Sequence, residues 1–126
     1  MKRKSKTPKT KAIEMAKKLV RSKKVCERCG QNKLDIQYHG AHIFHTNLSA
    51  VLAADPRNIM CLCAYCHRWG HRNPAQFVLD WFAKKYKKRY DELIIIKQTT
   101  KPIKDYQWEE IRQNLEREYN RLYGDN

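Results

Sequence analysis

Three parts of the chain repeat apolar residues at the spacing of an amphipathic helix. Residues 11–24 place apolar side chains three or four positions apart and fill the other faces with lysine and arginine, which predicts a basic helix. Pro74 suits the first turn of a second helix, which the pattern extends to about Tyr90. The aromatic face of that helix is expected in the core: Phe77, Val78, Trp81, Phe82 and Tyr86. Asp105 can cap a third helix, whose apolar face would serve packing or self-association: Trp108, Ile111, Leu115, Tyr119 and Leu122.

The middle of the chain changes to short apolar runs separated by turn residues. Leu34–Ile36 with Tyr38 predicts a short strand, and residues 39–44 predict a second extended piece. Within that piece, small Gly40 and Ala41 leave room for close approach of a backbone or a ligand. The remaining predictions are one or two helical turns at 48–54, a turn at 55–58, an apolar run at 59–62 and a helix opening at 66–70. Two strands, a loop and a helix predict a small α+β core.

Charge and composition divide the chain into four segments. The formal net charge is +14, and residues 1–24 carry eleven basic side chains against one acidic side chain. Residues 1–10 lack the apolar side chains of a packed element, which predicts a disordered basic arm. The basic helix at 11–24, the core at 25–73 and a helical extension at 74–126 follow. A chain this basic is expected to bind a polyanion, and nucleic acid is the first candidate.

Four of the five cysteines form two Cys-x2-Cys pairs, Cys26 with Cys29 and Cys63 with Cys66. Two intervening residues make a tight turn that points both sulfurs at one ion, so the pairs predict one structural, tetrahedral zinc. Gly30 can take the positive φ of such a turn. Cys61 is expected to be a small buried hydrophobic residue, because Cys61-x-Cys63 lacks the two-residue turn. The paired spacing and the odd count favour zinc over disulfides.

Five histidines lie within 33 residues, on a frame that the zinc would already fix. If both cysteine pairs bind one ion, the loop between them is pinned at its ends, and His42 can face His67. His67 and His71 are four residues apart, the spacing at which two imidazoles on one helix share a cation. These side chains predict a second site, separate from the zinc, that handles protons or another cation.

At this point the residues resemble the HNH endonucleases of the ββα-metal (His-Me finger) fold, in their zinc-ribbon form. The resemblance covers residue 26 to about residue 71 and depends on an ordered series: Cys26-x2-Cys29-Gly30, His42-Ile43, Asn58, Cys63-x2-Cys66-His67. The His-x3-His pair ending at His71 is similar to a variant in bacterial DNase toxins. Residues 66–74 and the helices after them look like small phage HNH proteins grouped with the NinG recombination proteins.

The resemblance implies a role for each of these residues. His42 would be the general base that activates water, His67 and His71 would hold a divalent cation, and Asn58 would brace the loop and orient His42. In most of the family an Asp or His directly precedes the base and binds the metal, whereas this chain has Ala41 there. His39 or His45 could fill the gap, or water and substrate phosphate could complete the shell. For either histidine taken alone, a structural role or a contact to phosphate is favoured over metal ligation.

The sequence therefore predicts a metal-dependent DNA endonuclease with a zinc-stapled core and flanking helices. Its catalytic cation would be Mg²⁺, Mn²⁺, Ni²⁺ or Zn²⁺. The resemblance implies 5′-phosphate and 3′-hydroxyl ends. The short chain favours low sequence specificity or recognition of DNA shape, and leaves nicking and double-strand cutting both open. The expected phosphate-binding residues are Lys2, Arg3, Lys4, Lys6, Lys9, Lys11, Arg68 and Arg72.

Two other functions remain open from the sequence. One is a non-catalytic zinc-ribbon adaptor that binds DNA in phage replication, recombination or packaging, and the other is RNA cleavage. The longest apolar runs are too short to cross a bilayer, so no membrane partner is expected. Reduced thiols and the lack of a secretory segment predict a cytoplasmic protein, in the host cytoplasm if the chain is viral.

Overall fold

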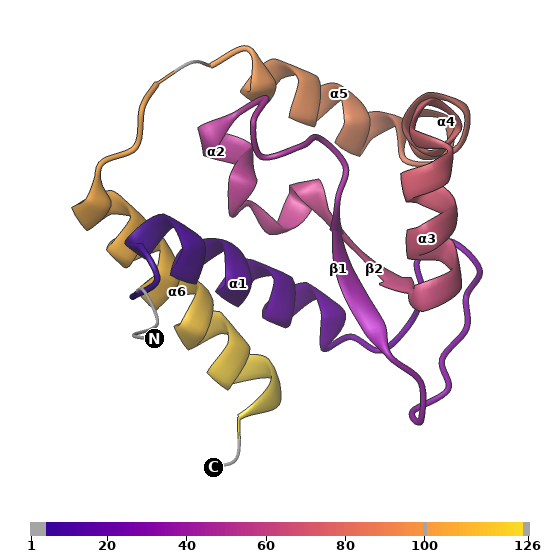
Figure 1. Ribbon diagram of the computed structural model, residues 1–126, viewed down its shortest axis with the longest axis horizontal. Coiled ribbons are helices and arrows are strands. Elements are labelled where there is room, and N and C mark those ends of the chain that lie inside the picture. The colour runs from indigo at the N-terminus through magenta and orange to yellow at the C-terminus, as the bar shows by residue number, and fades with distance from the viewer. Residues whose placement is uncertain (1–4, 100, 125–126) are drawn as a thin grey trace.

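The computed structural model describes residues 5–99 and 101–124, and it has an α+β fold with one small sheet (Figure 1). Strands β1 (Tyr38–His42) and β2 (Ile59–Cys63) pair antiparallel, with His39 opposite Leu62 and His42 opposite Ile59. All five residues of β2 are buried, which fits its uninterrupted apolar sequence. Helix α3 (Ala64–Arg72) begins directly after β2. Cys63 is the last residue of β2, and Cys66, His67 and His71 lie on α3.

The two strands differ from the predicted ones. Residues 34–36 form no strand, and Leu34 is 78% exposed. The predicted second piece is the first strand, and the apolar run that follows the turn supplies the other. Between them lie the short helix α2 (Ala50–Ala53), capped by Ser49, and a 3-10 turn at Pro56–Asn58, capped by Asp55. Leu34 and Ile36 are separated by Asp35, and so short an alternating segment does not form a strand where no partner strand pairs with it.

Helix α1 (Pro8–Arg21) begins and ends about three residues earlier than predicted. The Thr7 hydroxyl accepts a hydrogen bond from the Thr10 backbone N–H at 3.2 Å, and Pro8 occupies the first turn. The predicted arm of residues 1–10 is therefore helical from Pro8, and its residues 1–4 lie outside the described residues. Ala12, Ala16, Leu19 and Val20 form the buried face of the helix.

The segment after Pro74 is not the single helix that its periodicity predicts. It comprises a π-helical stretch (Gln76–Phe82), α4 (Ala83–Lys85) and α5 (Lys87–Lys97), with a break at Tyr86. The π-helical stretch has i→i+5 hydrogen bonds and a wider turn than an α-helix, and its two buried residues, Phe77 and Phe82, are five positions apart. Tyr86 leaves helical geometry with φ −118° and ψ 52°, and its hydroxyl donates to the Glu27 carbonyl at 3.2 Å. The aromatic face is in the core, as predicted.

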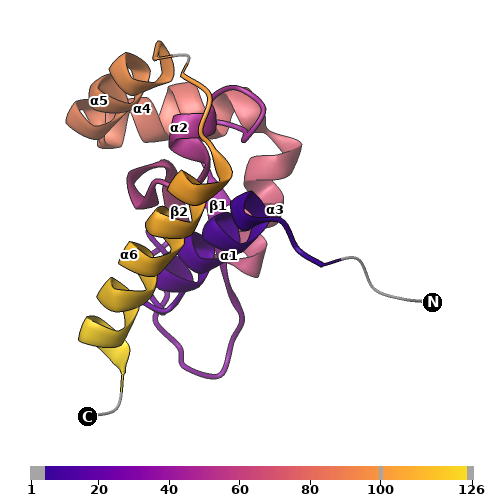
Figure 2. The same ribbon diagram turned by 90° about the vertical axis from the view of Figure 1, so that its left-hand side faces the viewer.

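Helix α6 (Asp105–Tyr123) packs alongside α1, as Figures 1 and 2 both show. Its apolar face buries Trp108 and Leu115 in the common core. Most of the face that the sequence offered for packing or self-association therefore packs within the chain, with Ile111 and Tyr119 partly buried, whereas Leu122 near the end of α6 is 49% exposed. Within residues 5–99 and 101–124, every helix is too short or too polar to span a membrane.

Candidate metal centre and histidine pocket

Cys26, Cys29, Cys63 and Cys66 come together at the end of the sheet. Their sulfurs all lie within 4.8 Å of one another, and all five cysteines of the chain are free thiols. The sulfurs of Cys29 and Cys63 are 3.8 Å apart. That separation is about the edge of a ZnS4 tetrahedron with bonds of ~2.3 Å. The four side chains therefore fit a structural metal such as zinc, as the pair spacing predicts.

Hydrogen bonds fix the first cysteine pair against β2. Gly30 takes a φ of +79°, the left-handed conformation predicted for the knuckle turn. The Glu27 backbone N–H donates to the Cys61 carbonyl at 2.8 Å, and its carboxylate accepts from the Cys61 N–H at 2.6 Å. The Arg28 guanidinium lies 3.7 Å from the centre of the Trp69 ring and donates to the Cys66 sulfur at 3.4 Å. A cation beside a thiolate ligand stabilises its charge.

The thiols differ in acidity because their surroundings differ. Burial raises the pKa of Cys66 to about 12. Burial also acts on Cys26, but the backbone N–H groups of Cys29, Cys63 and Arg28 outweigh it and lower the pKa to about 7. Cys61 is fully buried outside the cluster, with its sulfur 3.7 Å from the Arg21 carbonyl oxygen. It is the buried hydrophobic residue that its spacing predicts.

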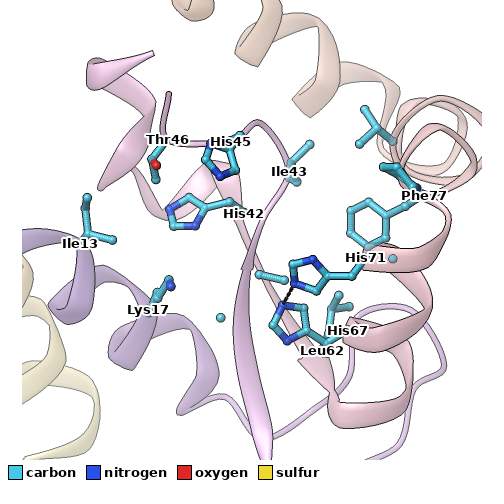
Figure 3. Close-up of a pocket in the computed structure, with 15 residues that line it drawn as sticks. Ile13, Lys17, His42, Ile43, His45, Thr46, Leu62, His67, His71 and Phe77 are labelled. Carbon is cyan, nitrogen blue, oxygen red and sulfur yellow. Dashed lines mark hydrogen bonds between the residues drawn. The ribbon is translucent and has the colours of Figure 1, made fainter. Parts of the chain in front are cut away.

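A pocket of about 540 Å³ opens over β1, between α1 and α3. Figure 3 shows His42 on one side of β1 with Lys17, and His67 and His71 on the other side. Gly40 and Ala41 line the pocket between these groups. Because neither residue has a long side chain, the space between the histidines is open to a ligand. The volume is in the range of small-ligand sites, roughly 300–1,000 Å³.

Among the residues that the structure describes, His42 is held through one ring nitrogen. Its Nε2 lies 2.7 Å from the Ala53 carbonyl oxygen, which can only accept a hydrogen bond. The proton of the neutral ring is therefore on Nε2, and Nδ1 keeps a free lone pair. Burial is the main reason that the pKa of His42 falls below its ordinary value of 6.5. A neutral imidazole with an unprotonated nitrogen is what a general base requires.

His67 and His71 lie on one face of α3, as their spacing predicts. Their Nε2 atoms are 3.0 Å apart. Two nitrogens bound at a right angle to one ion at ~2.1 Å would be about 3.0 Å apart, so the pair can hold a cation. Burial and the neighbouring His71 lower the pKa of His67 to about 4, which keeps that ring neutral at physiological pH.

The two candidate histidines for the missing ligand have different positions. His39 Nδ1 lies 2.7 Å from His67 Nδ1, on the far side of the His67 ring from His71. His45 is exposed, lines the pocket, and accepts a hydrogen bond from the Asn47 N–H at 3.2 Å. In the part of the chain that the structure describes, only the four cysteines converge as three or more ligands on one point.

Asn58 is completely buried beneath the segment that follows His42. Its side chain bonds to the backbone of Phe44 and to the Leu52 carbonyl, the latter at 3.1 Å. Its own carbonyl accepts from the Ile43 N–H at 2.8 Å. These bonds attach the end of β1 to the 3-10 turn. Asn58 thus ties the segment that follows His42 to α2 and to the 3-10 turn through hydrogen bonds.

Lys17 is a pocket residue that the sequence analysis missed. It lies on α1 and lines the pocket on the same side of β1 as His42. Burial is the main cause of the lowered pKa of His42 and His67, and the positive charge of Lys17 adds to both shifts. A Cβ on Gly40 would lie 2.9 Å from the Lys17 Cα, so the glycine permits the close approach that brings α1 to β1. Gly40 indicated in the sequence that something approaches this strand closely, but the sequence did not indicate that Lys17 is its neighbour.

The predicted phosphate-binding residues form two exposed groups. Lys6, Lys9 and Lys11 lie at the beginning of α1, and Arg68 and Arg72 lie on α3 next to the histidine pair. Lys9 also lies 5.9 Å above the Trp108 ring. Lys2, Arg3 and Lys4 are outside the described residues.

No protein family model, curated protein or solved structure matches this chain.

Proposed function

We propose that this protein is a metal-dependent DNA endonuclease of the HNH type, built on a ββα-metal core that a four-cysteine zinc stabilises. One observation carries the proposal: an imidazole with a free Nδ1, His42, shares a pocket with two Nε2 atoms 3.0 Å apart, those of His67 and His71. The succession of β1, β2 and α3 supports the fold assignment. A zinc module that only binds DNA has no need of this arrangement.

Hydrolysis of a phosphodiester would use the two sides of the pocket for different tasks. His42 Nδ1 removes a proton from water as the water oxygen bonds to phosphorus and the P–O3′ bond breaks. A divalent cation at His67 and His71 would supply Lewis-acid stabilisation of the phosphate and the leaving oxygen. By family resemblance the products carry 5′-phosphate and 3′-hydroxyl groups.

Lys17 is suited to binding the phosphate between these groups. Its ammonium is the cationic side chain on the α1 wall of the pocket, on the side of β1 where His42 lies. A positive charge at that place would stabilise the charge that develops on the nonbridging oxygens. Arg68, Arg72 and the basic beginning of α1 would extend the contact along the DNA backbone.

The experiment that tests the proposal is cleavage of supercoiled plasmid by the zinc-loaded protein with Mg²⁺, Mn²⁺, Ni²⁺ or added Zn²⁺. Nicked or linear product is expected from the wild type and should be lost in His42→Ala and His67→Ala, both of which should still bind DNA. Binding without cleavage under every metal would favour the adaptor, and cleavage of RNA alone would point to the other alternative.

A matched pair of lysine variants separates a pocket contact from general charge. Lys17→Ala and Lys23→Ala each remove one positive charge from the same part of the chain, but Lys23 is exposed beyond the end of α1. We expect Lys17→Ala to reduce the single-turnover rate by ~10² and Lys23→Ala to leave it nearly unchanged. Equal effects would show that Lys17 acts only through net charge.

A further inference from the structure

His39 lies behind His67, outside the lining of the pocket. His39 and Ala41 share one face of β1, because side chains alternate along a strand, and this face is directed toward α3. His67 and His71 line the pocket, whereas His39 does not. A cation that also binds water and phosphate needs the open side of His67. His39 is therefore on the wrong side of the ring to bind the same ion.

The contact between His39 and His67 requires a proton. Their Nδ1 atoms are 2.7 Å apart and their ring planes are nearly perpendicular, at 84°. Two lone pairs at this distance would repel, so one nitrogen must donate and the other must accept. If His39 donates, the His67 proton is on Nε2, and this nitrogen cannot bind a metal. If His67 donates, its Nε2 is free to bind a cation beside His71.

We propose that His39 is a positioning residue, whose Nδ1 accepts a hydrogen bond from His67 Nδ1 and thereby holds His67 as a cation ligand. The inference rests on the proposed cation site at His67 and His71. His39 would then not bind the cation itself. Its Nδ1 would fix the ring orientation and the tautomer of His67. A hydrogen bond to the second nitrogen of a ligating histidine commonly changes metal affinity by ~10–100-fold.

The other nitrogen of His39 makes the proposal more specific. His39 Nε2 is buried and has no hydrogen-bond partner among the described residues. When His39 accepts at Nδ1, its own proton must be on Nε2, and an unpaired buried donor costs free energy. An asparagine at this position would place its Oδ1 near the place of Nδ1, as an acceptor, and would have no group at the place of Nε2.

The test is Ni²⁺ binding to the zinc-loaded protein, measured by calorimetry for the wild type, His39→Asn and His39→Leu. Leucine keeps apolar volume but cannot accept a hydrogen bond. We expect His39→Asn to bind Ni²⁺ at least as tightly as the wild type, and His39→Leu to bind it ~10–100-fold more weakly. Nitrogen NMR of the Ni²⁺-free and diamagnetic Zn²⁺-bound forms should locate the His67 proton on Nδ1 when the second site is filled.

The outcomes distinguish this inference from the proposed function. Absence of any second-site Ni²⁺ binding in the wild type would contradict the cation site itself. Wild-type binding that His39→Leu retains unchanged would overturn only the role of His39. Equal weakening by His39→Asn and His39→Leu would overturn it in favour of direct ligation, because neither variant has an imidazole. Circular dichroism and zinc content confirm that each variant is folded.

Discussion

The side-chain amide of Asn58 bonds to both backbone groups of Phe44. Its Oδ1 accepts from the Phe44 N–H at 2.9 Å, and its Nδ2 donates to the Phe44 carbonyl at 2.9 Å. Phe44 is two residues after His42, so this two-point contact holds the backbone directly downstream of the proposed base. An amide is the side chain that can accept and donate side by side in this way.

Replacement of Asn58 should therefore destabilise the protein. Asn58→Ala removes three buried hydrogen bonds and leaves backbone groups of Phe44 and Leu52 unpaired, which should lower the free energy of unfolding by about 3 kcal/mol. Asn47→Ala, in the exposed part of the same loop, should change it by less than about 0.5 kcal/mol. Urea denaturation of the zinc-loaded proteins measures both. Similar values for the two variants would mean that Asn58 does not brace the loop.

The metal site allows a comparison within one residue type. Serine in place of Cys26, Cys29, Cys63 or Cys66 should abolish stoichiometric zinc binding and unfold the core, because metal binding is coupled to folding. Cys61→Ala should keep one zinc per chain, since its sulfur lies outside the cluster. Zinc analysis and X-ray absorption should give four Zn–S bonds of ~2.3 Å. Loss of zinc from Cys61→Ala would contradict the ligand assignment.

Cleavage should persist below the pH at which an ordinary histidine becomes protonated. Burial lowers the pKa of His42 from 6.5, so its neutral, proton-accepting form remains populated as the pH falls through that value. The acidic limb of the rate profile should thus have its midpoint below 6.5. Single-turnover rates from about pH 5 to 8 measure it. A midpoint above 6.5 would contradict the assignment of His42 as a buried base. The His42→Ala variant should cleave ~10² or more times slower than the wild type.

DNA affinity should depend on the residues before α1. Deletion of residues 1–6 removes Lys2, Arg3, Lys4 and Lys6 and retains the Thr7 cap of α1. For every phosphate that the shortened protein no longer neutralises, the slope of log affinity against log salt should flatten by ~0.9 on duplex DNA. Fluorescence anisotropy across a salt series measures the slope. If the slope is the same with and without these residues, they do not touch the DNA backbone.

Ala41 gives a test of the cation shell. Ala41 lines the pocket on the α3 side of β1, so Ala41→Asp would add a carboxylate next to the proposed cation and should tighten Mg²⁺ and Mn²⁺ activation. Ala41→Asn has nearly the same volume without the charge and should not. Metal titrations of plasmid cleavage compare the two variants. His67→Ala should instead weaken activation by every metal, and equal behaviour of the two Ala41 variants would place the cation elsewhere.

The parts of the fold and site that the sequence predicts are those set by local spacing. Two residues between cysteines determine a turn, and a spacing of four positions from His67 to His71, with three residues between them, determines a shared helix face, whatever the rest of the chain does. The buried aromatic face after Pro74 follows from periodicity in the same way. The strand predicted at Leu34–Ile36 is wrong, because a segment this short forms a strand only where a partner strand pairs with it.

Longer-range features required the structure. Nothing local indicates that Tyr86 leaves the helix, and its hydroxyl bonds to the Glu27 carbonyl, 59 positions away along the chain. In the sequence, Lys17 is one of many basic residues on α1. Its place in the pocket follows from the close packing of α1 on the sheet at Gly40. The position of His39 behind His67 depends on the pairing of β1 with β2, which joins residues about twenty positions apart.

Helix α1 connects the basic arm to the pocket as one rigid element. Its first residue, Pro8, is nine positions before Lys17, which corresponds to a rise of about 14 Å along a helix. For duplex DNA lying along this helix, that length corresponds to about four base pairs at ~3.4 Å each. The helix would then act as a spacer of fixed length. Contacts between the basic arm and the DNA phosphates would then determine the position of cleavage along the strand, without contacts to the bases.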